Sequence, residues 1–297
     1  MRRLRVLHRT IYVYSDVVSS SYGRAFLTPR EFPGQHLLSH DIRVDPVPSD
    51  RSVGTDVYGN TTLYFHVTAE HRRLEVTGES VVELESPTAP DEQPTWEQAR
   101  PSGENGPLAV EFALDLTPPE IIPEVAAYAA ESFPPGRPLL EAVKELTARI
   151  HTDFAYESGS TTVTTRVADV FADRHGVCQD FARLAIACLR SLGLAARYVS
   201  GYLATDPPPG KERMVGADAT HAWAAVWLPG DGEGLLGDGD GHWIGFDPTN
   251  NQFADDRYVT VAWGRDYADV PPLRGIIYTD AKESTITVSV DVAPLEE

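Results

Sequence analysis

Three residues whose side chains could act together as a catalytic group occur in the chain order Cys, His, Asp. Cys178 lies in H-G-V-C-Q-D-F-A-R-L, His221 in D-A-T-H-A-W, and Asp247 in W-I-G-F-D-P-T-N. These residue types are those of a thiol nucleophile, its general base and the carboxylate that orients the base. Each alone has a structural explanation, because single Cys and His residues are common in cores and strands. Together they predict an enzyme that forms a thioester.

Cys178 is expected at the N-terminus of a buried helix. Apolar residues recur at helical spacing after it, and Gly193 follows as a C-cap. Backbone N–H groups and the helix dipole at that end favour an anionic thiolate and could bind an oxyanion. Gly176 would let the chain turn tightly just before the nucleophile. Cys188, on the same helix, is interpreted as a core residue.

His221 and Asp247 fall in two expected strands, 219–228 and 242–247, joined by a loop rich in Gly and Asp. If the strands form an antiparallel hairpin, Asp247 should lie opposite His221. Side chains alternate along a strand, so His221, Trp223 and Trp227 should share one face with Asp247. A carboxylate beside the imidazole would fix its tautomer and stabilise the imidazolium.

The composition of the chain limits the classes of binding partner and the cellular compartment that can be expected. The chain has 297 residues and a formal net charge of -19. Such a surface repels phosphate backbones and anionic lipids, so neither nucleic acid nor membrane is an expected partner. Its two cysteines would lie about 15 Å apart on one helix, too far for a disulfide. The thiols are therefore expected to be free, and the sequence has neither a signal-peptide pattern nor an apolar stretch of about 20 residues. These features predict a cytoplasmic location.

Two domains are expected. Residues 1–85 read as a β-sandwich, because short segments rich in Val, Thr, Tyr and Leu alternate with turn residues. Residues 86–110 have linker composition, in which Trp96 could dock the linker onto a domain. Residues 111–297 should form the catalytic domain, with C-terminal β-strands. Its expected helices are 121–133, 139–151 and the Cys178 helix, and its expected strands are 195–203, 219–228, 242–247, 275–279 and 285–292.

The runs G-V-C-Q-D-F-A, L-G-L-A-A-R-Y-V-S-G-Y, D-A-T-H-A-W and W-I-G-F-D-P-T-N resemble the transglutaminase-like superfamily, in its bacterial cysteine-protease branch. L-T-P-R-E-F-P-G-Q-H, D-V-Y-G-N and G-R-D-Y-A-D-V-P-P-L-R-G resemble the same branch, so the similarity covers nearly the whole chain. It implies an α+β fold, with a papain-like transglutaminase core preceded by an N-terminal β-sandwich domain. It also implies that Cys178 is the nucleophile, His221 the base and Asp247 the orienter. Trp223 would either line the substrate site or pack beneath the His221 strand.

The expected substrate is a protein or peptide amide. Water would resolve the acyl-enzyme in a peptidase or amidase, and an amine would resolve it in a transglutaminase. The alternative is a non-catalytic binding or scaffold protein that retains a relic triad. The sequence leaves open the oligomeric state, the role of the β domain, and whether loops 204–217 and 229–241 gate the site.

No cofactor and no metal are expected. His36 and His40 are four residues apart, which suits a helix, but their segment reads as a strand. The run Asp238-Gly239-Asp240-Gly241 does not continue as an EF-hand loop requires, and a solvated loop explains it.

Overall fold

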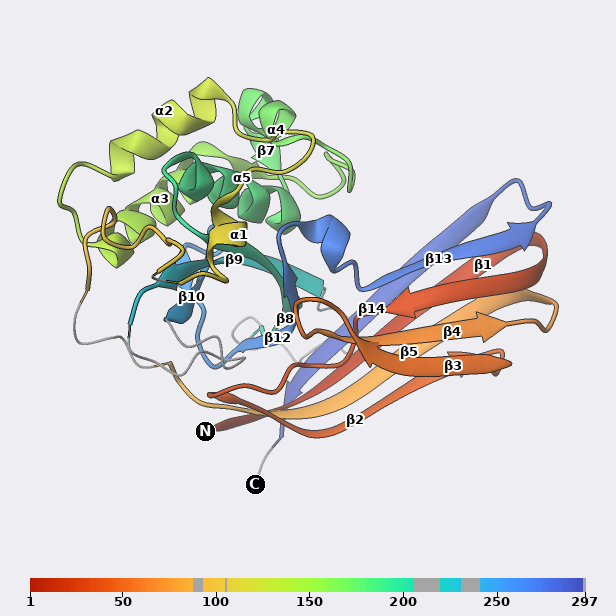
Figure 1. Cartoon of the computed structure of the whole chain (residues 1–297). Helices are drawn as coiled ribbons and strands as arrows, with labels where there is room; N and C mark the ends of the chain where they lie inside the picture. The colour runs from red at the N-terminus through yellow and green to blue at the C-terminus, as the bar shows by residue number, and fades with distance from the viewer. Residues whose placement is uncertain (88–92, 105, 206–219, 231–240, 296–297) are drawn as a thin grey trace, which may run out of the picture.

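The computed structural model of the chain describes residues 1–87, 93–104, 106–205, 220–230 and 241–295. A large β-sheet extends to one side, and a smaller sheet carries a layer of helices (Figure 1). The strands are β1 (Arg2–Ala25), β2 (Gln35–Asp45), β3 (Asp50–Thr55), β4 (Thr61–Val67), β5 (His71–Leu84), β6 (Ala155–Tyr156), β7 (His175–Gly176), β8 (Ala196–Leu203), β9 (Thr220–Leu228), β10 (His242–Asp247), β11 (Gln252–Phe253), β12 (Tyr258–Gly264), β13 (Leu273–Thr279) and β14 (Ser284–Pro294). The helices are α1 (Val110–Ala113), α2 (Pro123–Ser132), α3 (Leu139–Asp153), α4 (Val167–Asp173), α5 (Cys178–Ser191) and the short 3₁₀ helix η1 (Tyr267–Asp269).

The large sheet is built around β1. Its strand order is β2-β5-β1-β4-β3, and β13 and β14 also pair with β1. The register between β1 and β5 shifts between Val13 and Val18, which divides β1 into two halves. The first half lies between β5 and β14, and the second half between β4 and β13.

Two expectations about this part of the chain can be compared with its strand pairing, and only the second is contradicted. Hydrogen bonds join its strands in one sheet, so the predicted sandwich is not confirmed. The C-terminal strands β13 and β14 were assigned to the catalytic domain, but they pair with β1 in the N-terminal sheet. The physical reason is that β1 is long and that β4 and β5 each pair with only one side of one half of it. The backbone groups on the remaining sides need partners, and β13 and β14 supply them.

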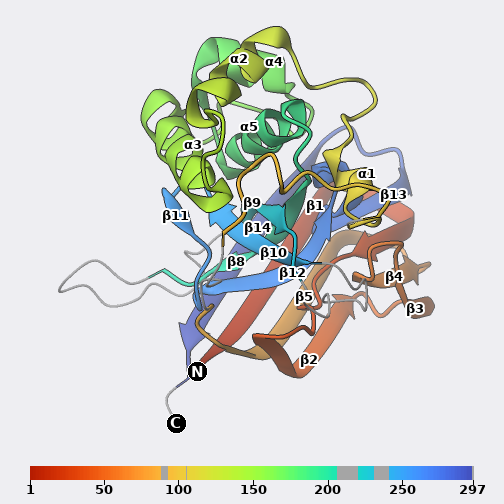
Figure 2. The same ribbon diagram turned by 60° about the vertical axis from the view of Figure 1, so that its left-hand side comes forward.

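The smaller sheet has the order β11-β10-β9-β8-β12 and carries α2, α3 and α5 on one face (Figure 2). Alternation along β9 explains its two-sided burial. Ala222, Ala224 and Val226 pack in the cluster that contains α5. Trp223 and Ala225 lie on the other face, in a cluster with residues of β8 and β12.

One hydrophobic cluster joins the two sheets. Val6 of β1 and Val290 of β14 belong to the same buried cluster as Leu184 of α5. Trp96 in the predicted linker is also buried there, and its indole N–H donates to the carbonyl of Pro134 at 2.9 Å. The N-terminal sheet and the smaller sheet with its helices therefore share apolar contacts, which fix one against the other.

The predicted helices at 121–133 and 139–151 correspond to α2 and α3, and the predicted Cys178 helix is α5. Helix α4 and strand β12 were not predicted. None of the described helices is both long and apolar enough to cross a membrane.

Candidate active site

Cys178 is the first residue of α5, as the sequence predicts, and is partly buried. The Asp180 carboxylate caps this helix end, because its Oδ2 accepts the Val177 N–H at 2.9 Å. A Cβ on Gly176 would lie 2.9 Å from the Asp180 Cβ, so glycine permits the close turn here. The cap holds the chain in place where it enters α5 and so positions Cys178 at the helix end. First-turn N–H groups at this end have no acceptor within the helix.

His221 and Asp247 come together at the ends of β9 and β10. His221 Nε2 lies 2.7 Å from Asp247 Oδ2. The predicted register is wrong by two residues, because Phe246 pairs with Ala224 and Asp247 therefore follows opposite Trp223. A shift of two residues leaves every side chain on its predicted face, and the carboxylate reaches His221 along the diagonal.

The Asp247 carboxylate is completely buried and is held from several directions. The Thr249 N–H donates to Oδ1 at 2.8 Å, and Oδ2 accepts the Asn250 amide at 2.7 Å and the Tyr258 hydroxyl at 2.8 Å. Burial opposes ionisation, but the hydrogen bonds and the charge of His221 outweigh it and lower the pKa of Asp247. A buried carboxylate with these partners stays ionised and orients the imidazole.

Sequence reasoning missed both Asn250 and Tyr258. Asn250 follows Asp247 by three residues in D-P-T-N, a spacing typical of a side chain that closes a turn. Tyr258 had no such signal, because its strand was not predicted.

His221 is the link between Asp247 and Cys178. Burial lowers the pKa of His221, but hydrogen bonds with Asp247 and with Cys178, and their charges, raise it to about 10. Because Nε2 faces Asp247, Nδ1 is the nitrogen left for the thiol. The structure thus brings together Cys178, His221 and Asp247, the three residues that the sequence predicts as a triad.

Cys178 and His221 line a cavity of about 290 Å³. Tyr198 of β8 and Tyr267 of η1 form part of its wall on the side of the smaller sheet. Burial, and secondarily charge at Cys178, raise the pKa of Tyr198 well above its usual value, so its hydroxyl stays protonated beside the thiol. The opposite wall comes from the N-terminal sheet, through His8, Thr10 and Tyr12 of β1 and Ile286 and Val288 of β14.

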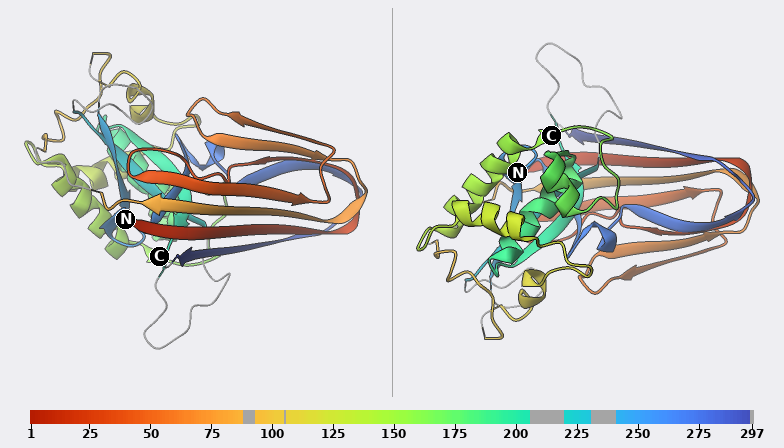
Figure 3. Two further views of the ribbon diagram at one scale, coloured as in Figure 1. Left: turned by 90° about the horizontal axis from the view of Figure 1, so that it is seen from below. Right: turned by 90° about the horizontal axis from the view of Figure 1, so that it is seen from above.

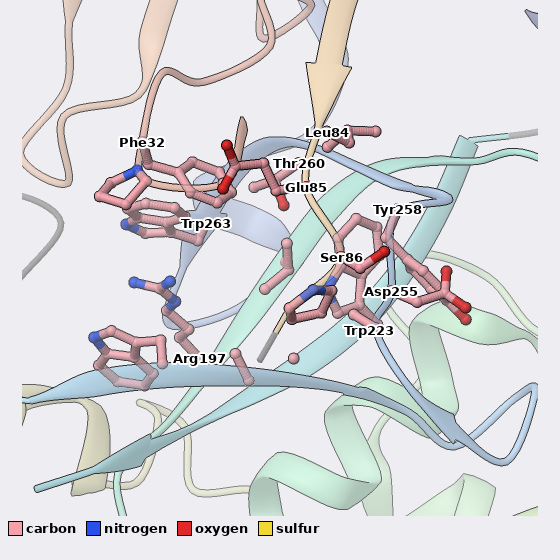
Figure 4. A pocket seen from close by; sticks show the side chains of 18 residues that line it. Phe32, Leu84, Glu85, Ser86, Arg197, Trp223, Asp255, Tyr258, Thr260 and Trp263 are labelled. Carbon is pink, nitrogen blue, oxygen red and sulfur yellow. The ribbon is translucent and has the colours of Figure 1, made fainter. Parts of the chain in front are cut away.

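Trp223 stacks against His221, with ring centroids 6.1 Å apart and planes at 25°. It does not line the Cys178 cavity. It lines a neighbouring cavity of about 370 Å³, together with Tyr258, Trp263 and Arg197 (Figure 4). This position supports packing beneath His221, and direct contact of Trp223 with a substrate stays a prediction.

Within the described residues, no group of three or more His, Cys, Asp or Glu side chains is placed to hold a metal ion. His36 instead faces Glu31, and His40 contacts the hydroxyls of Thr28 and Ser80. The run 238–240 lies outside the described residues, as do most of the loops that could gate the site.

Comparisons with known proteins agree with this architecture. The family described as Bacterial transglutaminase-like N-terminal region matches residues 4–83, and Transglutaminase-like superfamily matches residues 126–248. An uncharacterized protein of Mycobacterium tuberculosis is 59% identical over 300 residues, covering 99% of this chain and 93% of that protein. One from Mycobacterium leprae is 33% identical over 307 residues, covering 99% of this chain and all of that protein.

A solved structure shares the fold across the whole chain. The crystal structure of "a Putative Cysteine Protease" from Cytophaga hutchinsonii superposes with a TM-score of 0.74 at 20% identity, covering 100% of this chain and 91% of that one. The likeness supports the arrangement of both parts of the molecule. One family model matches the N-terminal strands and the other matches the region that contains Cys178 and His221. The chain therefore belongs to the transglutaminase-like superfamily.

Proposed function

We propose that the protein is a thiol enzyme that uses Cys178, His221 and Asp247 to form an acyl-enzyme from a protein or peptide amide. The observation that carries this proposal is the position of His221. It bonds to a buried, ionised carboxylate, and it lines one cavity with Cys178, whose interaction with the imidazole also raises the pKa of His221. A pKa near 10 for the imidazole means that it holds a proton at neutral pH, which favours the thiolate–imidazolium pair.

The reaction follows from this charge arrangement. The Cys178 thiolate attacks the amide carbonyl carbon and forms a C–S bond. The oxyanion accepts hydrogen bonds from first-turn N–H groups of α5. His221 then gives its proton to the leaving nitrogen as the C–N bond breaks, which releases ammonia or an amine and leaves a thioester.

His221 next takes a proton from the incoming nucleophile, either water or an amine. The nucleophile attacks the thioester carbonyl, and the C–S bond breaks to return the thiolate. Water gives peptidase or amidase activity, and an amine gives transglutaminase activity. The two unbridged cysteines fit the cytoplasmic location that is part of this proposal.

Alkylation by iodoacetamide tests the proposal without a known substrate. Cys178 labelling is followed by mass spectrometry from pH 4 to 10 in the wild type and in His221→Ala. Rapid labelling at pH 5–6 that His221→Ala abolishes is the expected result. Cys188 is an internal control, because burial raises its pKa to about 12.

Slow labelling of Cys178 that is the same in both proteins would contradict the proposal. That outcome would favour the non-catalytic binding or scaffold protein, in which the triad is a relic.

A further inference from the structure

A tyrosine in the wall of the Cys178 cavity has a hydroxyl that forms no hydrogen bond with any described residue. Tyr198 lines the cavity with Cys178 and His221, and its exposed fraction is only 2%. Its hydroxyl is nevertheless not one of the fully enclosed polar atoms that lack a partner in the described chain. The oxygen therefore opens onto the cavity, where a bound molecule can accept its hydrogen bond.

The fold holds the Tyr198 ring in one place. Tyr198 pairs with Ala224 of β9, and its side chain lies in the buried cluster that contains residues of α5. The Tyr267 ring packs edge-on against it, with centroids 6.2 Å apart and planes at 81°. The smaller sheet and its helices lie at one end of the long strands (Figure 3), and β1 and β14 supply the opposite wall of the cavity. A donor that is already in place needs no rearrangement when charge develops beside it.

The charge at Cys178 acts on this hydroxyl. Burial, followed by the charge at Cys178, raises the pKa of Tyr198 well above its ordinary value. Tyr198 therefore remains a hydrogen-bond donor at neutral pH, beside a thiol that must be anionic to react. Tyr267 lines the same cavity and its hydroxyl also has no described partner, but burial alone raises the pKa of Tyr267. The two tyrosines thus differ in whether the charge at Cys178 reaches them.

The start of α5 supplies further donors to the cavity. No backbone carbonyl of the described chain accepts the N–H of Cys178 or of Gln179. Both residues line the cavity, as Tyr198 does. Attack on a carbonyl carbon turns the carbonyl oxygen into an oxyanion, which preorganised backbone N–H groups and side chains such as Tyr stabilise. The cavity therefore contains both kinds of donor that an oxyanion requires.

We propose that Tyr198 is a catalytic residue whose hydroxyl donates a hydrogen bond to the oxyanion that forms when the Cys178 thiolate attacks a carbonyl carbon. The inference rests on the proposed function and names a further residue that acts on the reacting atoms. Tyr198 keeps its proton while the oxyanion collapses, the bond to the leaving group breaks and a thioester remains on Cys178. The hydroxyl therefore assists acylation of the thiol, and it does not assist alkylation, in which no oxyanion forms.

The test compares acylation with alkylation of Cys178 in the intact protein. With the protein in excess, p-nitrophenyl acetate acylates the thiol through an oxyanion and releases p-nitrophenolate, and iodoacetamide alkylates it with loss of iodide. Absorbance corrected with Cys178→Ala gives the first rate, and mass spectrometry of Cys178 gives the second. Each rate is divided by that of N-acetylcysteine with the same reagent. Tyr198→Phe should lower the scaled acylation rate by on the order of a hundredfold, the effect of losing one oxyanion donor, and should leave scaled alkylation unchanged.

Tyr267→Phe is the matched control, because it removes another tyrosine hydroxyl from the same cavity. It should keep the ratio of acylation to alkylation near that of the wild type. Tyr198→Phe should unfold at the same urea concentration as the wild type, because no described partner loses a hydrogen bond.

Unchanged acylation in Tyr198→Phe would overturn the assignment. An equal loss in Tyr267→Phe, or a parallel fall of acylation and alkylation in Tyr198→Phe, would also overturn it, because either result describes a general disturbance of the cavity. Failure of the proposed function appears separately, as iodoacetamide labelling that does not depend on His221.

Discussion

The Tyr258 hydroxyl donates to Asp247 Oδ2 at 2.8 Å, the same carboxylate oxygen that faces His221. This bond ties β12 to the end of β10. The Tyr258 hydroxyl stays neutral, because burial and the nearby carboxylate raise its pKa. It is thus a positioning residue for the Asp247 carboxylate.

Tyr258→Phe should destabilise the protein by about 1–2 kcal/mol at pH 7, because a buried carboxylate loses one donor. Urea unfolding measures this change in the free energy of unfolding. Tyr278→Phe is the control, since Tyr278 is exposed and should cost little. A Tyr258→Phe protein as stable as the wild type would show that the hydroxyl bond contributes nothing.

Asp247→Asn should slow Cys178 alkylation at pH 6 by on the order of tenfold, since each unit of pKa shift changes the ion-pair population about tenfold. The amide keeps the carboxylate's shape but loses the charge that raises the pKa of His221. Iodoacetamide kinetics measure the effect. Asp255→Asn, which alters a carboxylate paired with Arg257, should leave the rate unchanged. Equal rates in Asp247→Asn and the wild type would refute the role of this charge.

The raised pKa of His221 should make stability depend on pH in a defined direction. A folded-state pKa of about 10, above the ordinary 6.5, means that protonated His221 stabilises the fold fully below pH 6.5. The stabilisation is lost as the pH rises from 6.5 through the folded-state value.

The measurement compares Cys178→Ala with Cys178→Ala/His221→Gln by urea unfolding between pH 6 and 10. Removing the thiol leaves the His221–Asp247 pair alone and takes away one of the interactions that raise the pKa of His221. The pH range over which the stabilisation is lost therefore ends below pH 10. The histidine protein should lose about 1.5–3 kcal/mol more than the glutamine protein over this range, the contribution of a charged hydrogen bond. Parallel pH profiles would rule out the pair as a source of stability.

Gly176→Ala should destabilise the start of α5 by about 1–2 kcal/mol and slow Cys178 alkylation, because the new methyl group displaces the capping Asp180. Thermal unfolding and labelling kinetics report the two effects. Gly103→Ala is the control, since among the described residues only its own chain neighbours come within 4 Å of its added Cβ. If both alanine proteins behave alike, the close approach at Gly176 does not matter.

The sequence alone indicated much of the candidate site. The apolar period after Cys178 predicted a buried helix that begins at the cysteine, and α5 begins there. The alternation around His221 and Asp247 placed both on one face of a hairpin. These predictions rest on neighbours within a few residues, for which local pattern and backbone geometry are sufficient.

The sequence did not determine the partners that come from distant parts of the chain. Tyr258 reaches Asp247 only because β12 pairs with β8, and β14 pairs with β1 although about the whole chain separates them. Which strand fills an open edge depends on the edges that the rest of the fold leaves unpaired, and no local pattern records this. Local sequence was thus enough to recognise the Cys, His and Asp of the proposed triad, whereas tertiary structure decided the register of the His221–Asp247 pair and made the N-terminal sheet one wall of the Cys178 cavity.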